Sequence, residues 1–195
     1  MLRHLFLVVI VALLGCQRVE TLPTNYQGSD FGRVVIGMGE KDRGSLTDFR
    51  LRFRKIEDSR KEKSAHGTFL FDHNNTWSSQ KLDHDSEGDH GVVVAATLVP
   101  GEYEIFNYDI FINNYPSMSW VNSKRPFSFV FIVRPGEITY LGTYQYDAKS
   151  TPIIKVYNRS TEDLQVAGQK FSKQLDGFIN AVPMPYKNIP FPQQK

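Results

Sequence analysis

The sequence predicts a mainly β protein, an antiparallel β-sandwich of about eight strands with one C-terminal amphipathic helix. Segments in which apolar and polar residues alternate recur at short spacing between positions 32 and 157. Pro-Gly pairs separate some of these segments, and a helical pattern follows the last of them. Because 41% of the 195 residues are hydrophobic and 13% are aromatic, the chain can bury one sizeable core.

The chain opens with an apolar run from Leu5 to Leu14, preceded by Arg3 and His4. As a helix this run spans about 18 Å, which is shorter than the ~30 Å hydrocarbon core of a bilayer. A positive start followed by a short apolar run and small residues is typical of a secretory signal peptide. A buried helix and a short membrane anchor are the alternatives.

The run ends in Leu13-Leu14-Gly15-Cys16, which resembles the lipobox of bacterial lipoproteins, although the family more often has a smaller residue at the position of Leu14. The resemblance implies that residues 1–15 are removed and that Cys16 carries S-diacylglycerol and an N-acyl chain. We expect no other cofactor. Three fatty chains on one residue would anchor the protein stably, whereas one chain binds a membrane reversibly.

Export also explains why Cys16 is the only cysteine, since a second thiol in an oxidising compartment would need a partner. The predicted location is the cell envelope, with the membrane contacted through the lipid anchor. In Gram-negative lipoproteins an aspartate after the cysteine commonly retains the protein at the inner membrane. Gln17 at this position therefore favours the outer membrane if the source is Gram-negative.

The mature chain divides into an acylated cysteine with a flexible tether (16–30), a β-sandwich domain with its helix (31–180) and a proline-rich extended tail (181–195). The formal net charge of the full chain is only +2. A strongly cationic surface is the usual sign of a nucleic-acid partner, so we expect no nucleic-acid binding.

Eight segments show the strand pattern, and the fifth of them, "EYEIFNYDIFI", changes parity at Ile105-Phe106, which predicts a β-bulge. The predicted strands lie at 32–39, 48–56, 67–71, 92–98, 102–112, 127–133, 138–146 and 152–157.

Two predicted turns, at 99–102 and 134–137, place a proline before a glycine, Gly101 and Gly136 respectively, and both read as type II turns. Over residues 90–146, a hydrophobic strand, "PGE" and an aromatic-rich strand resemble the prealbumin-like sandwich modules of carboxypeptidase regulatory domains and uncharacterised bacterial lipoproteins.

The helical pattern lies in "STEDLQVAGQKFSKQLDGF", where Ser160 or Thr161 can cap the first turn and Gly177 can end the last. Its apolar residues recur at helical spacing, so one side must pack on a face or an end of the sandwich. These residues are Leu164, Ala167, Phe171, Leu175 and Phe178.

The common sequence motifs of nucleophilic, phosphate-binding and zinc-dependent enzymes do not occur in the chain. We therefore expect a non-catalytic binding or scaffolding module with an envelope protein or polymer as its partner. A small-ligand or metal-binding lipoprotein is the second hypothesis, and an envelope hydrolase is the third.

The segment "DHDSEGDH" at 83–90 is the most suggestive polar cluster, and it partly matches the start of a calcium loop. The match fails because Val94 occupies the position of the final acid and strands replace the flanking helices. A solvated hairpin loop is the main interpretation, and a metal site is the alternative. The candidate ligands are Asp83, His84, Asp85, Glu87, Asp89 and His90.

Arg50, Arg52 and Arg54 alternate with apolar residues and form a cationic row on the outer side of one predicted strand. This row could meet anionic lipid headgroups or acidic polymers, but a solvated strand face is the simpler interpretation. Several aromatic residues could line a ligand groove, but packing in the core is the simpler interpretation. They are Tyr103, Phe106, Tyr108, Phe111, Tyr115 and Trp120.

Overall fold

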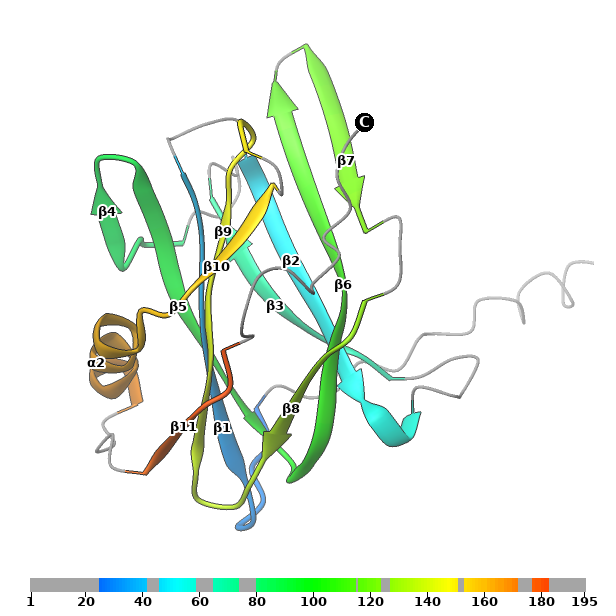
Figure 1. Cartoon of the computed structure of the whole chain (residues 1–195), viewed down its shortest axis with the longest axis vertical. Helices are drawn as coiled ribbons and strands as arrows, with labels where there is room; N and C mark the ends of the chain where they lie inside the picture. Colours follow the sequence, from blue (N-terminus) through cyan, green and yellow to red (C-terminus); the bar gives the residue numbers. More distant parts are fainter. Residues whose placement is uncertain are drawn as a thin grey trace, which may run out of the picture.

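Over the residues that it describes, the computed structural model is mainly β, with two mostly antiparallel sheets and one α-helix (Figure 1). It describes residues 25–41, 46–58, 65–73, 80–114, 116–123, 127–150, 153–171 and 177–182. Cys16, the predicted signal peptide and residues 183–195 lie outside these ranges. Within the described residues, no helix is both long and apolar enough to cross a membrane.

Every predicted strand segment coincides with a strand of the structure. These strands are β1 (Gly32–Glu40), β2 (Leu46–Lys55), β3 (Gly67–Asp72), β5 (Asp89–Leu98), β6 (Gly101–Asn114), β8 (Phe129–Val133), β9 (Ile138–Tyr146) and β10 (Ile154–Tyr157). Three further strands raise the total above the predicted eight, namely β4 (His84–Ser86), β7 (Ser117–Asn122) and β11 (Phe178–Asn180). A short 3-10 helix, η1 (Ile56–Asp58), follows β2.

The six-stranded sheet has the order β10-β9-β1-β5-β4, and β11 pairs with β9 beside this path. The expectation of purely antiparallel pairing is wrong in this sheet, because β9 runs parallel to both β1 and β11. The β1–β9 register shifts between Val35 and Gly37, opposite Gly142, whose φ is +94°. A positive φ favours glycine at such an irregularity.

The five-stranded sheet has the order β3-β2-β6-β7, with β8 paired to β6. Strand β7 pairs with residues 109–114 of β6, and β8 pairs with residues 101–105. Both are antiparallel to β6, so together they form one margin of this sheet.

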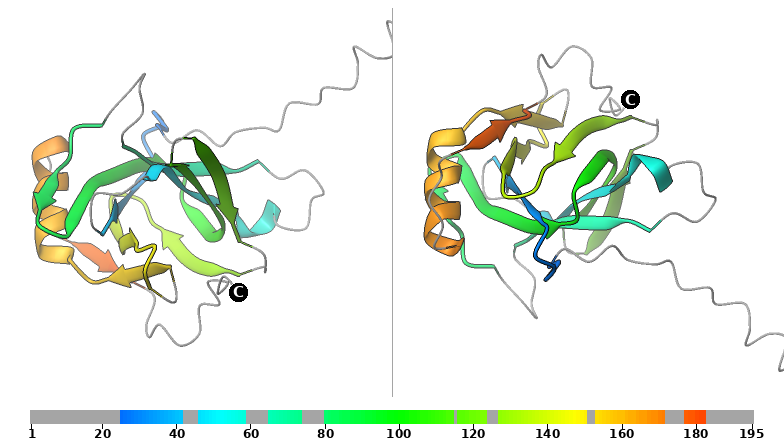
Figure 2. Two further views of the ribbon diagram at one scale, coloured as in Figure 1. Left: turned by 90° about the horizontal axis from the view of Figure 1, so that it is seen from above. Right: turned by 90° about the horizontal axis from the view of Figure 1, so that it is seen from below.

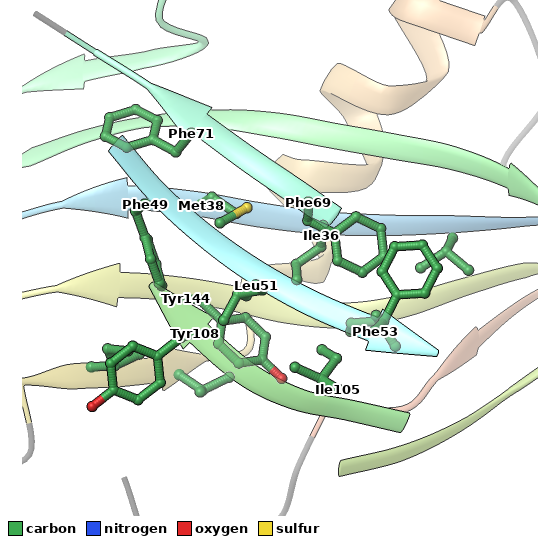
Figure 3. Packing of buried hydrophobic residues seen from close by; sticks show 14 of the residues in the cluster. Ile36, Met38, Phe49, Leu51, Phe53, Phe69, Phe71, Ile105, Tyr108 and Tyr144 are labelled. Carbon is green, nitrogen blue, oxygen red and sulfur yellow. The ribbon is translucent and has the colours of Figure 1, made fainter. Parts of the chain in front are cut away.

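The main core lies between the two sheets, where buried side chains from both sheets pack together (Figure 3). Phe49, Leu51 and Phe53 project from β2 into this layer and are fully buried, as are Ile36 and Met38 of β1. The Arg residues that alternate with the β2 apolar residues therefore lie on the opposite side of the sheet.

Strand β6 contains the predicted bulge. Arg52 pairs with Asn107 and Phe53 pairs with Ile105, so Phe106 has no opposite residue in the ladder. The extra residue restores the parity of the strand, and residues on both sides of it are buried in the same core.

The two Pro-Gly segments differ. Gly136 has φ of +72°, and the Glu137 N–H donates to the Arg134 carbonyl over 3.2 Å, as a type II turn requires. Gly101 has φ of +154° and is already the first residue of β6, so the predicted type II turn at 99–102 is wrong. The backbone at Gly101 is more extended than the third residue of a type II turn.

Helix α2 (Ser160–Phe171) lies on the outer side of the six-stranded sheet (Figure 2). Leu164 and Ala167 are buried there in a second apolar cluster with side chains of β1, β5 and β9. The predicted helix is too long, because Phe178 belongs to β11 and is 42% exposed. Leu175 and the side chain of Phe171 lie outside the described residues.

The chain joins the fold earlier than the predicted boundary at residue 31. Asn25 forms a parallel bridge with Thr97, and the Tyr26 N–H donates to the Thr97 carbonyl over 3.0 Å. Thr97 pairs with Arg33, so this entry point lies at the amino-terminal end of β1.

Candidate functional site

The 83–90 segment was predicted to be a solvated hairpin loop, but most of it lies in paired strands. Strand β4 pairs with the start of β5, and Gly88 has a φ of +75° in the turn between them. The acidic residues of this segment are not simply solvated. A carboxylate oxygen of Asp83 accepts the Val93 N–H over 2.7 Å, and Lys170 from helix α2 pairs with the same carboxylate. Asp83 therefore connects the hairpin to the helix.

His84 is directed toward a buried carboxylate on helix α2. Its Nε2 lies 3.0 Å from Oδ1 of Asp163, which is fully buried. The other oxygen of Asp163 accepts hydrogen bonds from the Tyr140 hydroxyl at 2.8 Å and the Thr143 hydroxyl at 2.5 Å. Burial and the adjacent Asp163 charge raise the pKa of Tyr140, so its phenol remains protonated and can donate.

The remaining candidates of this segment have separate partners. Nδ1 of His90 lies 2.8 Å from a carboxylate oxygen of Asp85. Asp89 accepts a hydrogen bond from Gln145 at 3.2 Å and pairs with Arg159. Glu87 is exposed at the tip of the hairpin.

The six candidate ligands thus diverge toward different neighbours. In the part of the chain that the structure describes, no three His, Cys, Asp or Glu side chains form a group that could hold a metal ion. The metal site remains the untested alternative for this segment.

Sequence reasoning missed the long-range partners of this hairpin, which lie 56 to 87 residues away in the chain. One signal was available. Asp163 and Lys170 are seven residues apart, so they lie on the same side of a helix, and both reach the β4–β5 hairpin. The negative charge of Asp163 suits a neighbouring histidine, and the positive charge of Lys170 suits a neighbouring acid.

The cationic row on β2 is present, but each arginine is paired with an acid on the same sheet. Arg50 contacts Asp48 at 2.5 Å, Arg52 contacts Asp109 at 2.6 Å and Arg54 contacts Glu104 at 2.8 Å. These three ion pairs largely cancel the positive field of the row.

The predicted groove aromatics divide between the two sides of the five-stranded sheet. Tyr103 and Tyr108 are buried in the core. Phe106, Phe111 and Trp120 lie on the outer side, where the Phe111 and Trp120 rings are 4.7 Å apart. Tyr115 lies outside the described residues.

Two arginines of the row lie over aromatic rings of the outer side. The guanidinium carbon of Arg54 lies 4.3 Å from the centre of the Phe106 ring, and that of Arg50 lies 5.7 Å from the Trp120 ring. The outer side is thus a layer of ion pairs interleaved with rings.

Four large apolar side chains are exposed beside this layer, and we call them the β7–β8 face. Met118 and Trp120 are opposite Asn113 and Phe111 in the ladder, while Val130 and Ile132 are opposite Glu104 and Glu102. Their exposed fractions are 65%, 56%, 49% and 40%, listed from Met118 to Ile132. The two pairs lie at opposite ends of β6, at least seven residues apart along the strand, so the β7–β8 face consists of two exposed apolar pairs on one side of the sheet. Exposed apolar side chains of this kind can mark an interaction surface.

No protein-family model matches this sequence, and no curated protein matches it. Among solved structures, a leucine-rich repeat protein from Bacteroides thetaiotaomicron is similar in part, with a TM-score of 0.35 and 10% identity. The match covers 62% of this chain and 14% of that chain, so this protein spans a small fraction of the other one. A likeness at this level indicates neither fold nor function.

Proposed function

We propose that this chain is a lipid-anchored lipoprotein of the bacterial cell envelope and acts as a non-catalytic binding module. Leu13-Leu14-Gly15-Cys16 supports the anchor, and the apolar core shared by the two sheets supports a β-sandwich. On this proposal the acyl groups on Cys16 hold the domain at a membrane, the outer one in a Gram-negative source.

The entry of the chain into the fold gives the domain an orientation on this proposal. An extended chain from Cys16 to Asn25 reaches at most about 30 Å, so the end of the fold at Asn25 and Thr97 faces the membrane. The outer side of the five-stranded sheet then faces sideways, where a partner at the same membrane can reach it.

The partner that this sheet fits best is an envelope protein. The observation that carries the proposal is the β7–β8 face, whose apolar side chains gain most from contact with another apolar surface. An acidic polymer or anionic headgroups would need uncompensated cations, but Arg50, Arg52 and Arg54 are already paired with acids. Trp and Arg at one surface are also typical of protein interfaces.

Photo-crosslinking from defined positions tests this proposal in cells that make the full-length protein. A photoreactive benzoylphenylalanine replaces Trp120 in one version and Phe178, an exposed aromatic on the other sheet, in a matched control. We expect a light-dependent adduct of defined mass from position 120 that is weakened by Ile132→Ser and absent from position 178. Equal adducts from both positions, or none from position 120, would refute the docking face.

A further inference from the structure

A pocket of about 300 Å³ with several polar side chains in its lining lies on the outer side of the six-stranded sheet. It is bounded by the end of β1, the β4–β5 turn, the second half of β9 and the connection between β10 and helix α2. Its lining residues are Lys41, Gly88, Asp89, Thr143, Gln145, Tyr157 and Arg159. The pocket takes no part in the β7–β8 face, which belongs to the other sheet.

Glycines keep this region of the sheet free of large side chains. Gly39 of β1 pairs with Gly91 of β5, and a Cβ at Gly39 would lie 2.3 Å from the His90 carbonyl oxygen. Helix α2 covers the apolar half of the same sheet side, around Tyr140 and Leu164. The polar half beyond the first turn of the helix is left as a hollow.

The polar side chains around the hollow are fixed by bonds to one another. Asp89 holds Gln145 at 3.2 Å and pairs with Arg159, so groups from β5, β9 and the β10–α2 connection are joined. Thr143 is fixed by its hydrogen bond to the buried Asp163. A ligand would therefore meet groups that are already positioned, which lowers the entropic cost of binding.

The charges around the pocket favour an anion. Arg159 and Asp89 form an ion pair whose charges cancel, so Lys41 supplies the positive charge of the lining. Nζ of Lys41 is 4.0 Å from Asp147, whereas Lys155 approaches the same carboxylate oxygen to 3.2 Å. Lys41 is thus the more weakly held of the two lysines, and its side chain is 46% exposed.

The remaining lining groups favour a ligand that also carries hydroxyls. Asp89 accepts hydrogen bonds, and the Gln145 amide both donates and accepts them. Arg159 uses one N–H group to contact Asp89, and its other N–H groups can donate to a ligand. Tyr157 offers a ring that is partly exposed, 39% by residue, on one wall. A hydroxyl group both donates and accepts, so neighbouring hydroxyls match such a mixed set.

We infer that this pocket binds a small hydroxylated carboxylate of the size of one sugar acid. The carboxylate would lie at Lys41, and the hydroxyls would contact Gln145, Asp89 and the donors of Arg159 that Asp89 does not use. The inference concerns only this pocket, so it holds or fails independently of the docking face.

Saturation-transfer NMR on the detergent-solubilised full-length protein tests the inference, with D-glucuronate as the probe and glucose, acetate and inorganic phosphate as comparisons. We expect millimolar or tighter binding of glucuronate and clearly weaker binding of the other three. Lys41→Gln should weaken glucuronate binding about tenfold, which corresponds to about 1.4 kcal/mol. Lys81→Gln removes the same charge from an exposed position away from the pocket and should leave binding unchanged.

Each contrary result overturns the inference. No binding of glucuronate at millimolar concentration, or equal binding by the parent and Lys41→Gln, would exclude the pocket as its site. If Lys81→Gln weakened glucuronate binding as much as Lys41→Gln, the overall charge of the protein alone would attract the ligand. Phosphate or acetate binding as tightly as glucuronate would show that the hydroxyls are not recognised. Melting curves of both variants establish that they are folded.

Discussion

The carboxylate of Asp163 occupies the space above Gly37, where a Cβ at position 37 would lie 2.5 Å from Oδ2 of Asp163. The same Cβ would lie 2.7 Å from the Thr143 hydroxyl oxygen. A strand glycine thus makes room for a buried acid that bonds Tyr140, Thr143 and His84. Because a buried carboxylate without hydrogen bonds is costly, this site couples helix α2 to the sheet.

Gly37→Ala should therefore destabilise the fold by about 1–3 kcal/mol, the usual cost of an added methyl group in a tightly packed site. The methyl group cannot fit without displacing both Asp163 and Thr143. Denaturant unfolding of the parent and the variant measures the difference. A double-mutant cycle with Asp163→Ala supplies the control, because the methyl group should cost less once the carboxylate is absent and only the Thr143 contacts remain. Additive effects would contradict the account.

Gly136→Ala should cost about 1–2 kcal/mol for a different reason, because φ at this residue is +72° and no atom lies within 4 Å of the added Cβ. The cost would come from the backbone alone. Gly136→Asn is the matched variant, since asparagine tolerates positive φ better, and it should lose less stability than the alanine variant in denaturant unfolding. Equal losses would point to a contact instead of backbone conformation.

Asp147 should contribute acid-sensitive stability. Burial alone would raise the pKa of its carboxyl, but the hydrogen bonds from the Lys149 amide and Lys155, with the charges of Lys155 and Lys41, lower it below the ordinary 3.8. The stabilisation is thus present above pH 3.8 and is lost as the pH falls through the lower folded pKa.

Unfolding of the parent and Asp147→Asn across acidic pH measures this contribution. The parent should be the more stable protein at neutral pH, and the difference should shrink below pH 3.8. A difference that does not change with pH would show that the charge of Asp147 contributes nothing.

Tyr108 should make the fold sensitive to alkali, because burial raises the pKa of its phenol from 10.0 to about 12. The folded state favours the neutral phenol, so stability present below pH 10.0 is lost as the pH rises toward about 12. In Tyr108→Phe this loss should be smaller by about 1–3 kcal/mol. Unfolding free energies of both proteins between neutral pH and pH 12 test the difference. If the unfolding free energies of the two proteins changed with pH in the same way, burial of the Tyr108 phenol would not explain the sensitivity to alkali.

Apolar and alternating segments located the major strands, and the parity change at Phe106 located the bulge. Strand β3 alternates because one side lies in the core, whereas β1 and β9 are mostly apolar because both of their sides are buried. The strands that were missed lack this signal. Strand β7 has almost every side chain exposed, and β4 and β11 are three residues long. Phe178 was assigned to the helix because its spacing continues the apolar stripe, although it lies in β11 directly after Gly177.

The sheet partners and the site could not be predicted from these patterns, because both depend on residues distant in the chain. The parallel pairing of β1 with β9 leaves no mark on either strand alone. The acids of 83–90 suggested one cation site, but Asp83, His84 and Asp89 instead meet Lys170, Asp163 and Arg159 from helix α2 and the residues before it. The charge row of β2 likewise gave no indication of its partners on β6.

The proposed orientation of the domain at a membrane rests on the proposed lipid anchor at Cys16, and metabolic labelling with palmitate tests this anchor most directly. Cells that make the full-length parent or Cys16→Ser are labelled, and the protein is isolated from the membrane and soluble fractions. The account predicts that the parent is labelled and shortened by removal of residues 1–15, whereas Cys16→Ser keeps its full length and carries no label. Equal labelling of the parent and the variant would contradict the account.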